Sequence, residues 1–145
     1  MSIYLPVVKV LPLTKEFMNL KTYNKGDVGF DLRSSEDVVL EADSFKRILC
    51  TARIQMEEGY FAVIMGRSGL SQKGVQCHIG LIDSTYTGHL SPTLYNHSDS
   101  PYLIKKGDRI AQLVFFTQTP VEFKEVEGFE DVGRGEKGFG STGEK

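Results

Sequence analysis

The chain is organised around the stretch Gly80-Leu81-Ile82-Asp83-Ser84-Thr85-Tyr86-Thr87-Gly88, near its middle. Two glycines bracket a run with apolar Leu81 and Ile82, which predicts a β-hairpin or a tight loop leaving a buried strand. Such an element would hold Asp83 and Tyr86 in fixed positions, so that the carboxylate could take a proton from a water and the ring could wall a small ligand. On this stretch alone, the alternative is a structural hairpin whose Asp belongs to the turn and whose Tyr belongs to the core.

The overall composition is that of an ordinary globular domain. The chain has 145 residues, of which 40% are hydrophobic and 25% are charged, enough for one domain with a single core. Its formal net charge is −2 and its pI is about 5.9, which argues against broad, sequence-independent binding of nucleic acid. Any site for an anion must therefore be local.

The cysteines and the apolar runs indicate the cellular compartment of the protein. Cys50 and Cys77 are too few for a disulfide framework and too far apart for a zinc cluster, so we interpret them as free thiols in a reducing compartment. Residues 3–13 are apolar but are interrupted by two prolines and a lysine, which favours an opening strand over a signal peptide. No apolar run approaches the roughly 18 residues that span a membrane. We expect a soluble intracellular protein, cytoplasmic or nuclear, without a membrane or a stable nucleic-acid partner.

Short apolar runs separated by turn residues predict an all-β fold. None of them sustains a helical period, whereas β-branched residues recur on an alternating background. The Gly107-Asp108 turn feeds a strongly apolar strand that ends at residue 116. The other predicted strands cover residues 3–10, 38–40, 45–53, 60–65, 90–95, 102–104 and 121–126.

Polar residues interrupt this apolar background at three places. Gly66-Arg67-Ser68-Gly69 predicts a turn that leads into one short helix before Gly74, and its glycines, free N–H groups and guanidinium suit an anion. The alternative there is a plain turn. Val28-Gly29-Phe30-Asp31-Leu32 places a second carboxylate among apolar residues beside a glycine. Gln112 is a long amide in an apolar strand, and its simplest interpretation is a side chain that faces solvent.

The last part of the chain differs in composition from the rest. We predict a core over residues 1–127 and a mobile Gly-rich arm over residues 128–145, because the arm has too few apolar residues to order itself. Residues 134–143 offer cations, hydroxyls, backbone N–H groups and the ring of Phe139, the chemistry of a phosphate clasp that orders as a lid on a nucleotide. The alternative is a disordered linker without a function.

Five stretches of the chain form an ordered set. They are Val28-Gly29-Phe30-Asp31-Leu32, Gly66-Arg67-Ser68-Gly69, residues 80–88, Gly107-Asp108-Arg109-Ile110-Ala111-Gln112-Leu113, and residues 134–143. In this order they resemble the five motifs of the trimeric deoxyuridine triphosphatases (dUTPases), from end to end of the domain. The second and fourth match almost letter for letter, and the Gly-Phe-Gly-Ser-Thr-Gly ending of the fifth is highly specific.

The resemblance implies a single-domain β-fold of the jelly-roll or β-clip type, assembled as a homotrimer with three active sites at subunit contacts. It implies an enzyme that hydrolyses dUTP to dUMP and pyrophosphate with Mg²⁺ as cofactor, by attack of water on the α-phosphorus. That reaction keeps uracil out of DNA and supplies dUMP for dTTP synthesis. The residues present suit it, because attack on a polyanion needs charge neutralisation, a positioned water and a closed site.

Roles follow from the matching positions, residue by residue. The resemblance implies that Asp83 orients and deprotonates the attacking water, that Tyr86 packs under the deoxyribose and excludes a 2′-hydroxyl, and that Asp31 holds the metal through water. Phosphate groups would be bound by a neighbouring subunit and by an arm from the third. The implied substrate-binding residues are Arg67, Ser68, Gly69 and Gln112 for the phosphates, Gly80, Leu81, Ile82 and Ser91 for the uracil edge, and Arg134, Phe139, Gly140, Ser141 and Thr142 on the arm, with Phe139 stacked on uracil.

The chain departs from the common pattern at a few positions. Thr85 and Thr87 stand where the family often has an acidic residue and an arginine, so a possible ion pair is lost and we expect altered turn contacts. Ile79 replaces a small residue, and it either crowds the wall of the uracil pocket or fills core. Glu136 and Lys137 lie in the flexible part of the arm, where we expect little effect on the chemistry.

Two other functions fit the same scaffold. A dCTP deaminase-type enzyme would need an additional carboxylate over the cytosine amino group, and residues 80–88 offer only Asp83. A catalytically idle relative would bind the nucleotide as a regulator, a reading that the intact Asp83, Gln112 and Phe139 oppose.

Overall fold

The computed structural model of the chain describes residues 2–13, 20 and 24–138. In these residues the fold is built from eleven strands and one helical turn, so the all-β prediction is confirmed. The helical turn, α1 (Ser68–Ser71), lies where the sequence predicts a short helix. The strands are β1 (Lys9–Pro12), β2 (Phe30–Arg33), β3 (Val38–Leu40), β4 (Ser44–Arg47), β5 (Ala52–Gln55), β6 (Tyr60–Met65), β7 (Val75–Cys77), β8 (Gly80–Ile82), β9 (Thr93–Asn96), β10 (Tyr102–Ile104) and β11 (Arg109–Thr117).

The largest sheet has the strand order β2-β11-β6-β8, and all its pairs are antiparallel. Gln112 in β11 lies directly opposite Asp31 on one neighbour and Met65 on the other. Directly opposed residues point to the same face of a sheet. The next residue of β11, Leu113, points to the other face and is fully buried. The register of this sheet therefore gathers polar side chains on one face and core residues on the other.

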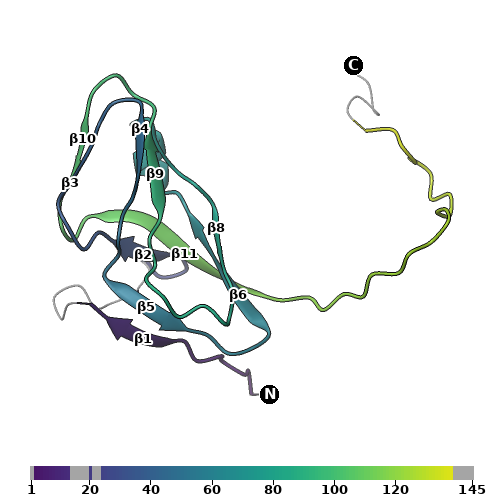
Figure 1. Cartoon of the computed structure of the whole chain (residues 1–145). Helices are drawn as coiled ribbons and strands as arrows, with labels where there is room; N and C mark the ends of the chain where they lie inside the picture. Colours follow the sequence, from purple (N-terminus) through teal and green to yellow (C-terminus); the bar gives the residue numbers. More distant parts are fainter. Residues whose placement is uncertain (1, 14–19, 21–23, 139–145) are drawn as a thin grey trace.

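Smaller pairings complete the body of the domain. β1 pairs with β5 at one end, and β3 with β10 lies at the other, near the three-stranded sheet β4-β9-β7 (Figure 1). The apolar residues that meet between these sheets form one core. It includes Leu32, Leu40, Ile48, Ile54, Ile64, Leu70, Leu90, Leu94, Ile104, Ile110 and Leu113.

Several predicted strands differ in extent from the observed ones. The run at residues 3–10 contributes only the start of β1, because the residues before Lys9 are not paired in a ladder. The single strand predicted at 45–53 is two strands, β4 and β5, which belong to different sheets. The strand predicted at 90–95 begins later, at Thr93. The prediction of a strand at 121–126 is wrong, since that segment is extended chain without a partner strand.

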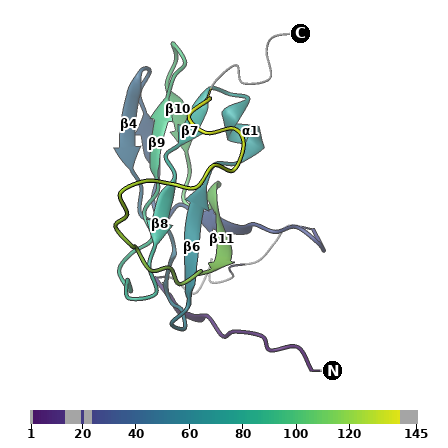
Figure 2. The same cartoon turned by 90° about the vertical axis from the view of Figure 1, so that its right-hand side faces the viewer.

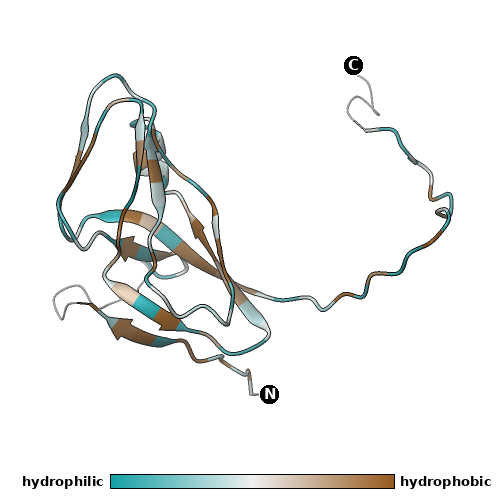
Figure 3. Cartoon of the chain, viewed as in Figure 1, coloured by the Kyte–Doolittle hydropathy of each residue, from teal (hydrophilic) through white to brown (hydrophobic). Residues whose placement is uncertain are grey.

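The described residues after β11 run away from the body as an extended segment (Figure 1). In the view of Figure 2, turned by 90°, the same segment crosses in front of the body. Every residue from 116 to 138 is exposed. Hydrophobic residues recur between hydrophilic ones along this segment (Figure 3), with Phe123 94% and Phe129 96% exposed. Their β-like composition explains the wrong strand prediction, because apolar pattern alone does not show whether a partner strand exists. Among the described residues, no helix has the length and apolar character needed to cross a membrane.

Candidate active site

The stretch at residues 80–88 forms a short strand followed by a tight loop. β8 pairs with β6, with Ile82 opposite Ala62, and not with the strand that follows it in the chain, so the loop alternative holds and the hairpin does not. Ile82 is buried, whereas Asp83 is exposed immediately after it. The loop then turns back, with the Tyr86 N–H donating to the Asp83 carbonyl at 3.0 Å.

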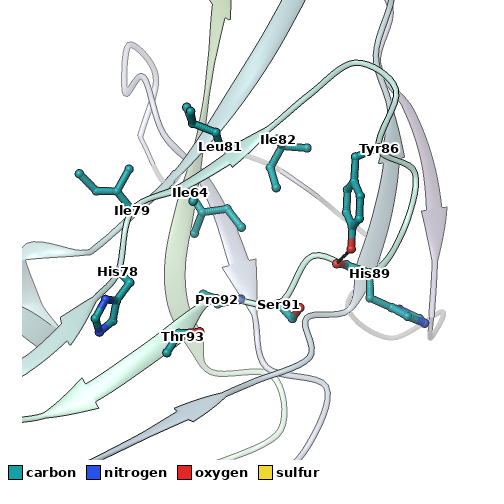
Figure 4. A pocket seen from close by; sticks show the side chains of 11 residues that line it. Ile64, His78, Ile79, Leu81, Ile82, Tyr86, His89, Ser91, Pro92 and Thr93 are labelled. Carbon is teal, nitrogen blue, oxygen red and sulfur yellow. Dashed lines mark hydrogen bonds between the residues drawn. The ribbon is translucent and has the colours of Figure 1, made fainter.

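Tyr86 is fixed by this loop and does not belong to the core. Its side chain is 39% exposed, and its hydroxyl donates to the His89 carbonyl at 2.8 Å (Figure 4). Gly88 lies under the ring, since a Cβ at that position would come 2.5 Å from the Tyr86 hydroxyl oxygen. A glycine is therefore needed at position 88, because a side chain there would clash with Tyr86.

A pocket of about 240 Å³ opens between β8, this loop and the start of β9. Tyr86 stands at one end of it, and His78 and Ile79 stand at the other (Figure 4). The lining contains all five residues predicted for the base and sugar. They are Gly80, Leu81, Ile82, Tyr86 and Ser91, with Ile64, His78, Ile79, His89, Pro92 and Thr93 completing the wall.

Two residues at this pocket decide points that the sequence left open. Ile79 is 74% exposed while it lines the pocket, so it forms part of the pocket rim and does not fill core. Ser91 accepts a hydrogen bond from Nε of Arg47 at 2.7 Å, which leaves its own O–H free to be donated elsewhere. Sequence reasoning missed Arg47, because nothing in the pattern of β4 indicates that its side chain reaches residue 91.

A second cluster consists of charged and polar residues on β2, β6 and β11, at positions that lie opposite one another in the sheet. Asp31 is only 13% exposed and lies between two guanidinium groups, with Arg67 Nε at 3.4 Å and Arg109 Nη1 at 3.5 Å. Arg67 also donates to the Arg109 carbonyl at 3.0 Å. Gln112 donates to the Gly66 carbonyl at 2.8 Å, so it is not a side chain that merely faces solvent. Arg109 belongs to the fourth motif, but only the structure shows that it pairs with Asp31.

This cluster borders a second pocket of about 460 Å³. The Arg67 guanidinium, the Ser68 hydroxyl and the Gln112 amide can donate hydrogen bonds to an anion there, beside the carboxylates of Asp27 and Asp31. Asp27, Val28, Gly29, Asp31, Met65, Arg67, Ser68, Gln112 and Val114 line the pocket. Gly69 lines a neighbouring pocket beside Arg67.

The donor set of this cluster suits one kind of metal ion. Among the described residues, no three His, Cys, Asp or Glu side chains gather around a common point. Mg²⁺ does not need such a cage, because it usually keeps several waters and takes one or two carboxylates together with substrate phosphates. A single partly buried carboxylate, Asp31, beside an anion site fits that coordination preference.

The two pockets lie at different strands of the large sheet. The first is lined by β8, the edge strand, with Leu81 and Ile82 pointing to its two faces, and the second is lined by residues of β2, β11 and the end of β6. The two linings share no residue, and β6 lies between β8 and β11. Within one chain, the predicted base pocket and the predicted phosphate residues therefore form two separate places.

The predicted arm residues divide between described and undescribed parts of the chain. Arg134 is exposed on the segment that leaves the body, and its guanidinium donates to the carbonyl of Gly138 at 2.7 Å within its own turn. Phe139, Gly140, Ser141 and Thr142 lie outside the described residues.

Comparison with known proteins gives a consistent result. A family model described as dUTPase matches residues 15–143. The mitochondrial deoxyuridine 5′-triphosphate nucleotidohydrolase of Dictyostelium discoideum is 36% identical over 138 residues, which cover 94% of this chain and 77% of that protein. The deoxyuridine 5′-triphosphate nucleotidohydrolase of Paramecium bursaria Chlorella virus 1 is 41% identical over 121 residues, covering 83% and 86% of the two chains.

Solved structures agree in fold over nearly the whole chain. The dUTPase of Staphylococcus bacteriophage 80alpha, solved with dUPNHPP, has a TM-score of 0.86 and 34% identity, and the match covers 94% of this chain and 98% of that one. A mutant dUTPase from phage phi11 of S. aureus, described as coordinating a structural Mg(II) ion, has a TM-score of 0.79 and 28% identity, covering 86% and 99%.

The fold and the two pockets define a small all-β protein of the jelly-roll class that presents a nucleoside-sized pocket and an anion-binding cluster. With the comparisons, the identification becomes specific: the chain belongs to the dUTPase family.

Proposed function

We propose that the two pockets serve one reaction, the hydrolysis of dUTP to dUMP and pyrophosphate. The chain is a dUTP diphosphatase, because it belongs to the dUTPase family and its relatives over most of its length are deoxyuridine 5′-triphosphate nucleotidohydrolases. The reaction removes dUTP, which limits uracil in DNA, and supplies dUMP for dTTP synthesis. The roles of individual residues, the metal and the assembly are proposals.

The pocket beside β8 takes the nucleoside. The backbone of Gly80, Leu81 and Ile82 and the hydroxyl of Ser91 would read the uracil edge, since each lines the pocket. The Tyr86 ring would pack under the deoxyribose, where its fixed position leaves no room for a 2′-hydroxyl. Discrimination against ribose would then be steric.

Asp83 would act as the general base. It follows the pocket-lining Ile82 directly, it is exposed, and its backbone carbonyl is held by the turn to Tyr86. A carboxylate at the outer edge of the nucleoside pocket is placed for a water that attacks the α-phosphorus from the side of the sugar.

Phosphate groups would be bound by the second cluster. Arg67, Ser68, Gly69 and Gln112 supply a guanidinium, a hydroxyl, backbone N–H groups and an amide at one end of α1 and β11. Asp31 would hold Mg²⁺ through water, and the bound ion would supply charge neutralisation for the phosphates. Arg67 and Arg109 hold the Asp31 carboxylate in place before the ion arrives.

One observation supports an assembly with shared sites: the two pockets share no lining residue and lie at different strands of the large sheet in one chain. In a homotrimer, as the resemblance implies, the base pocket of one subunit would meet the phosphate cluster of another. The arm, with Arg134, Phe139, Gly140, Ser141 and Thr142, would close the site from a third subunit, and the extension of its described residues away from the body accords with that.

The reducing, intracellular setting is also part of this proposal. Cys50 and Cys77 are free and buried. We expect neither a membrane nor a nucleic acid among the partners.

The reaction is tested by incubating the purified protein with dUTP, UTP and the four common dNTPs, with Mg²⁺ or with EDTA, and following pyrophosphate and ammonia release. Metal-dependent pyrophosphate release from dUTP alone is expected. Ammonia release from dCTP would point to a deaminase, and dUTP binding without turnover would point to a regulator.

Shared sites are tested by mixing two inactive variants. Asp83→Asn and Arg67→Ala should each be inactive alone, whereas subunits co-refolded from both should form mixed trimers in which some sites receive an intact Asp83 and an intact Arg67. Recovery of activity is expected. Absence of recovery in assemblies of confirmed mixed composition would contradict sites built from different subunits.

A further inference from the structure

The loop that carries Asp83 and Tyr86 is closed by contacts within itself. The Tyr86 N–H donates to the Asp83 carbonyl at 3.0 Å, and the Tyr86 hydroxyl donates to the His89 carbonyl at 2.8 Å. These bonds fix the shape of the loop. They do not fix where the loop stands against the rest of the domain.

Arg53 reaches this loop from β5. Its Nε donates to the Thr87 carbonyl at 2.7 Å, and its backbone forms an isolated antiparallel bridge with His89. β5 is itself paired with β1, where Leu11 lies opposite Arg53. An arginine on a paired strand thus meets the segment that directly follows Tyr86.

An open groove lies beside this contact. Its volume is about 360 Å³, and Arg53 and Thr87 both line it, together with Lys9, Val10, Leu11, Ile54 and Gln55. Since the groove is open, side-chain packing does not press Thr87 onto β5 from that side. A hydrogen bond from a charged donor is stronger than one between neutral groups, so the guanidinium is suited to hold the loop there.

We propose that Arg53 is a positioning residue for the active site: it holds the Thr87 carbonyl, and through it keeps Tyr86 and Asp83 in place beside the nucleoside pocket. The inference rests on the roles proposed above for Tyr86 and Asp83. Thr87 stands where the family often has an arginine, and in this chain the guanidinium at this place is that of Arg53, which reaches the loop from β5. Arg53 acts through the loop and does not itself touch the substrate.

Arg53→Met tests this role, because it removes the donor while keeping an unbranched side chain. A loosened loop lets the Tyr86 ring withdraw from the sugar wall, so kcat/KM for dUTP should fall by about tenfold, the effect of one charged hydrogen bond. The ratio of kcat/KM for dUTP to that for UTP should fall as well. Arg53→Lys keeps a cationic donor and should recover part of both. Lys9→Met removes a cation from the same groove and should change neither.

The selectivity ratio separates positioning from folding, since it does not depend on the fraction of folded enzyme. An unchanged ratio of kcat/KM for dUTP to kcat/KM for UTP would overturn the inference. This holds both when the activity is normal and when it falls in proportion to the amount of folded protein. The proposed function fails by a different result: an Asp83→Asn variant as active as the wild type. An inactive Asp83→Asn variant beside an Arg53→Met variant of normal rate and selectivity would overturn the role of Arg53 alone.

Discussion

Gly29 faces the side-chain amide of Gln112 so closely that a Cβ at position 29 would lie 1.9 Å from Gln112 Oε1. The amide is held in turn by its bond to the Gly66 carbonyl. The glycine of the first motif, the glutamine of the fourth and the glycine that begins the second are thereby locked together beside the anion-binding cluster. This contact explains in physical terms why a glycine stands two residues before Asp31.

Gly29→Ala should displace the Gln112 amide and break its bond to Gly66. Because the amide is the flexible end of a side chain, we expect a loss in the free energy of unfolding of only about 1 kcal/mol, with a larger relative loss in kcat/KM for dUTP. Urea unfolding and steady-state kinetics measure the two. Gly128→Ala, where an added Cβ meets nothing within 4 Å, is the stability control. Normal kinetics in Gly29→Ala would show that the position of the Gln112 amide does not matter for turnover of dUTP.

Asp31→Asn should leave Arg67 and Arg109 facing each other without an anion between them. We expect a stability loss of about 1 kcal/mol, because all three groups keep some contact with solvent, and a strong loss of Mg²⁺-dependent turnover. Thermal unfolding and a Mg²⁺ titration of the rate measure these effects. Asp37→Asn removes a carboxylate that accepts the backbone N–H of Lys106, and it should keep the wild-type Mg²⁺ dependence.

Asp83→Asn should keep the fold and the binding of dUTP but lose turnover by about a hundredfold or more, the usual contribution of a general base. Its carboxylate is exposed, so no core contact is disturbed. Single-turnover kinetics and calorimetric binding of a non-hydrolysable dUTP analogue measure the two properties. Asp99→Asn, at another exposed carboxylate, is the matched control. A rate near that of the wild type would exclude Asp83 as the base.

A chain that ends before Arg134 should fold normally and lose nearly all activity. No residue from 116 to 138 is buried, so the described part of the removed segment, residues 134–138, contributes nothing to the core of its own chain, whereas the proposed lid residues are lost. Thermal unfolding and pyrophosphate release measure the two effects. A truncated protein with normal turnover would show that the arm is not a lid.

Alkaline pH should destabilise the protein through its buried thiols. Burial raises the pKa of Cys77 from 9.0 to about 11, and burial raises the pKa of Cys50 further. Between pH 9 and 11 the unfolded chain therefore loses these protons before the folded chain does, and the free energy of unfolding falls as pH rises, by up to about 1.4 kcal/mol per pH unit for each thiol. Urea unfolding at several pH values measures the slope. Cys77→Ala should make it shallower, and an unchanged slope would contradict this origin.

The sequence by itself determined the fold class and the identity of most candidate site residues. Alternating apolar runs predict strands because a pleated strand sends successive side chains to opposite faces, and β9 follows that pattern, with Leu94 buried and its neighbours Thr93 and Tyr95 partly exposed. Glycine-bracketed motifs mark places where backbone must approach another group, as Gly29 and Gly88 do. The apolar segment at 121–126 misled the prediction, because a strand needs a partner that local sequence does not reveal.

Tertiary structure alone decided which of these residues meet. Asp31, Met65 and Gln112 come together through antiparallel register, which no local pattern specifies. The strand order puts the nucleoside pocket at the edge strand β8 and the phosphate cluster around β2 and β11, an arrangement that no motif spacing contains. The contacts made by Arg47 and Arg53 were likewise invisible in the sequence, because a long, flexible side chain on one strand can reach any neighbour that the fold brings near, and hydrogen bonds between distant segments form only once the strands are packed.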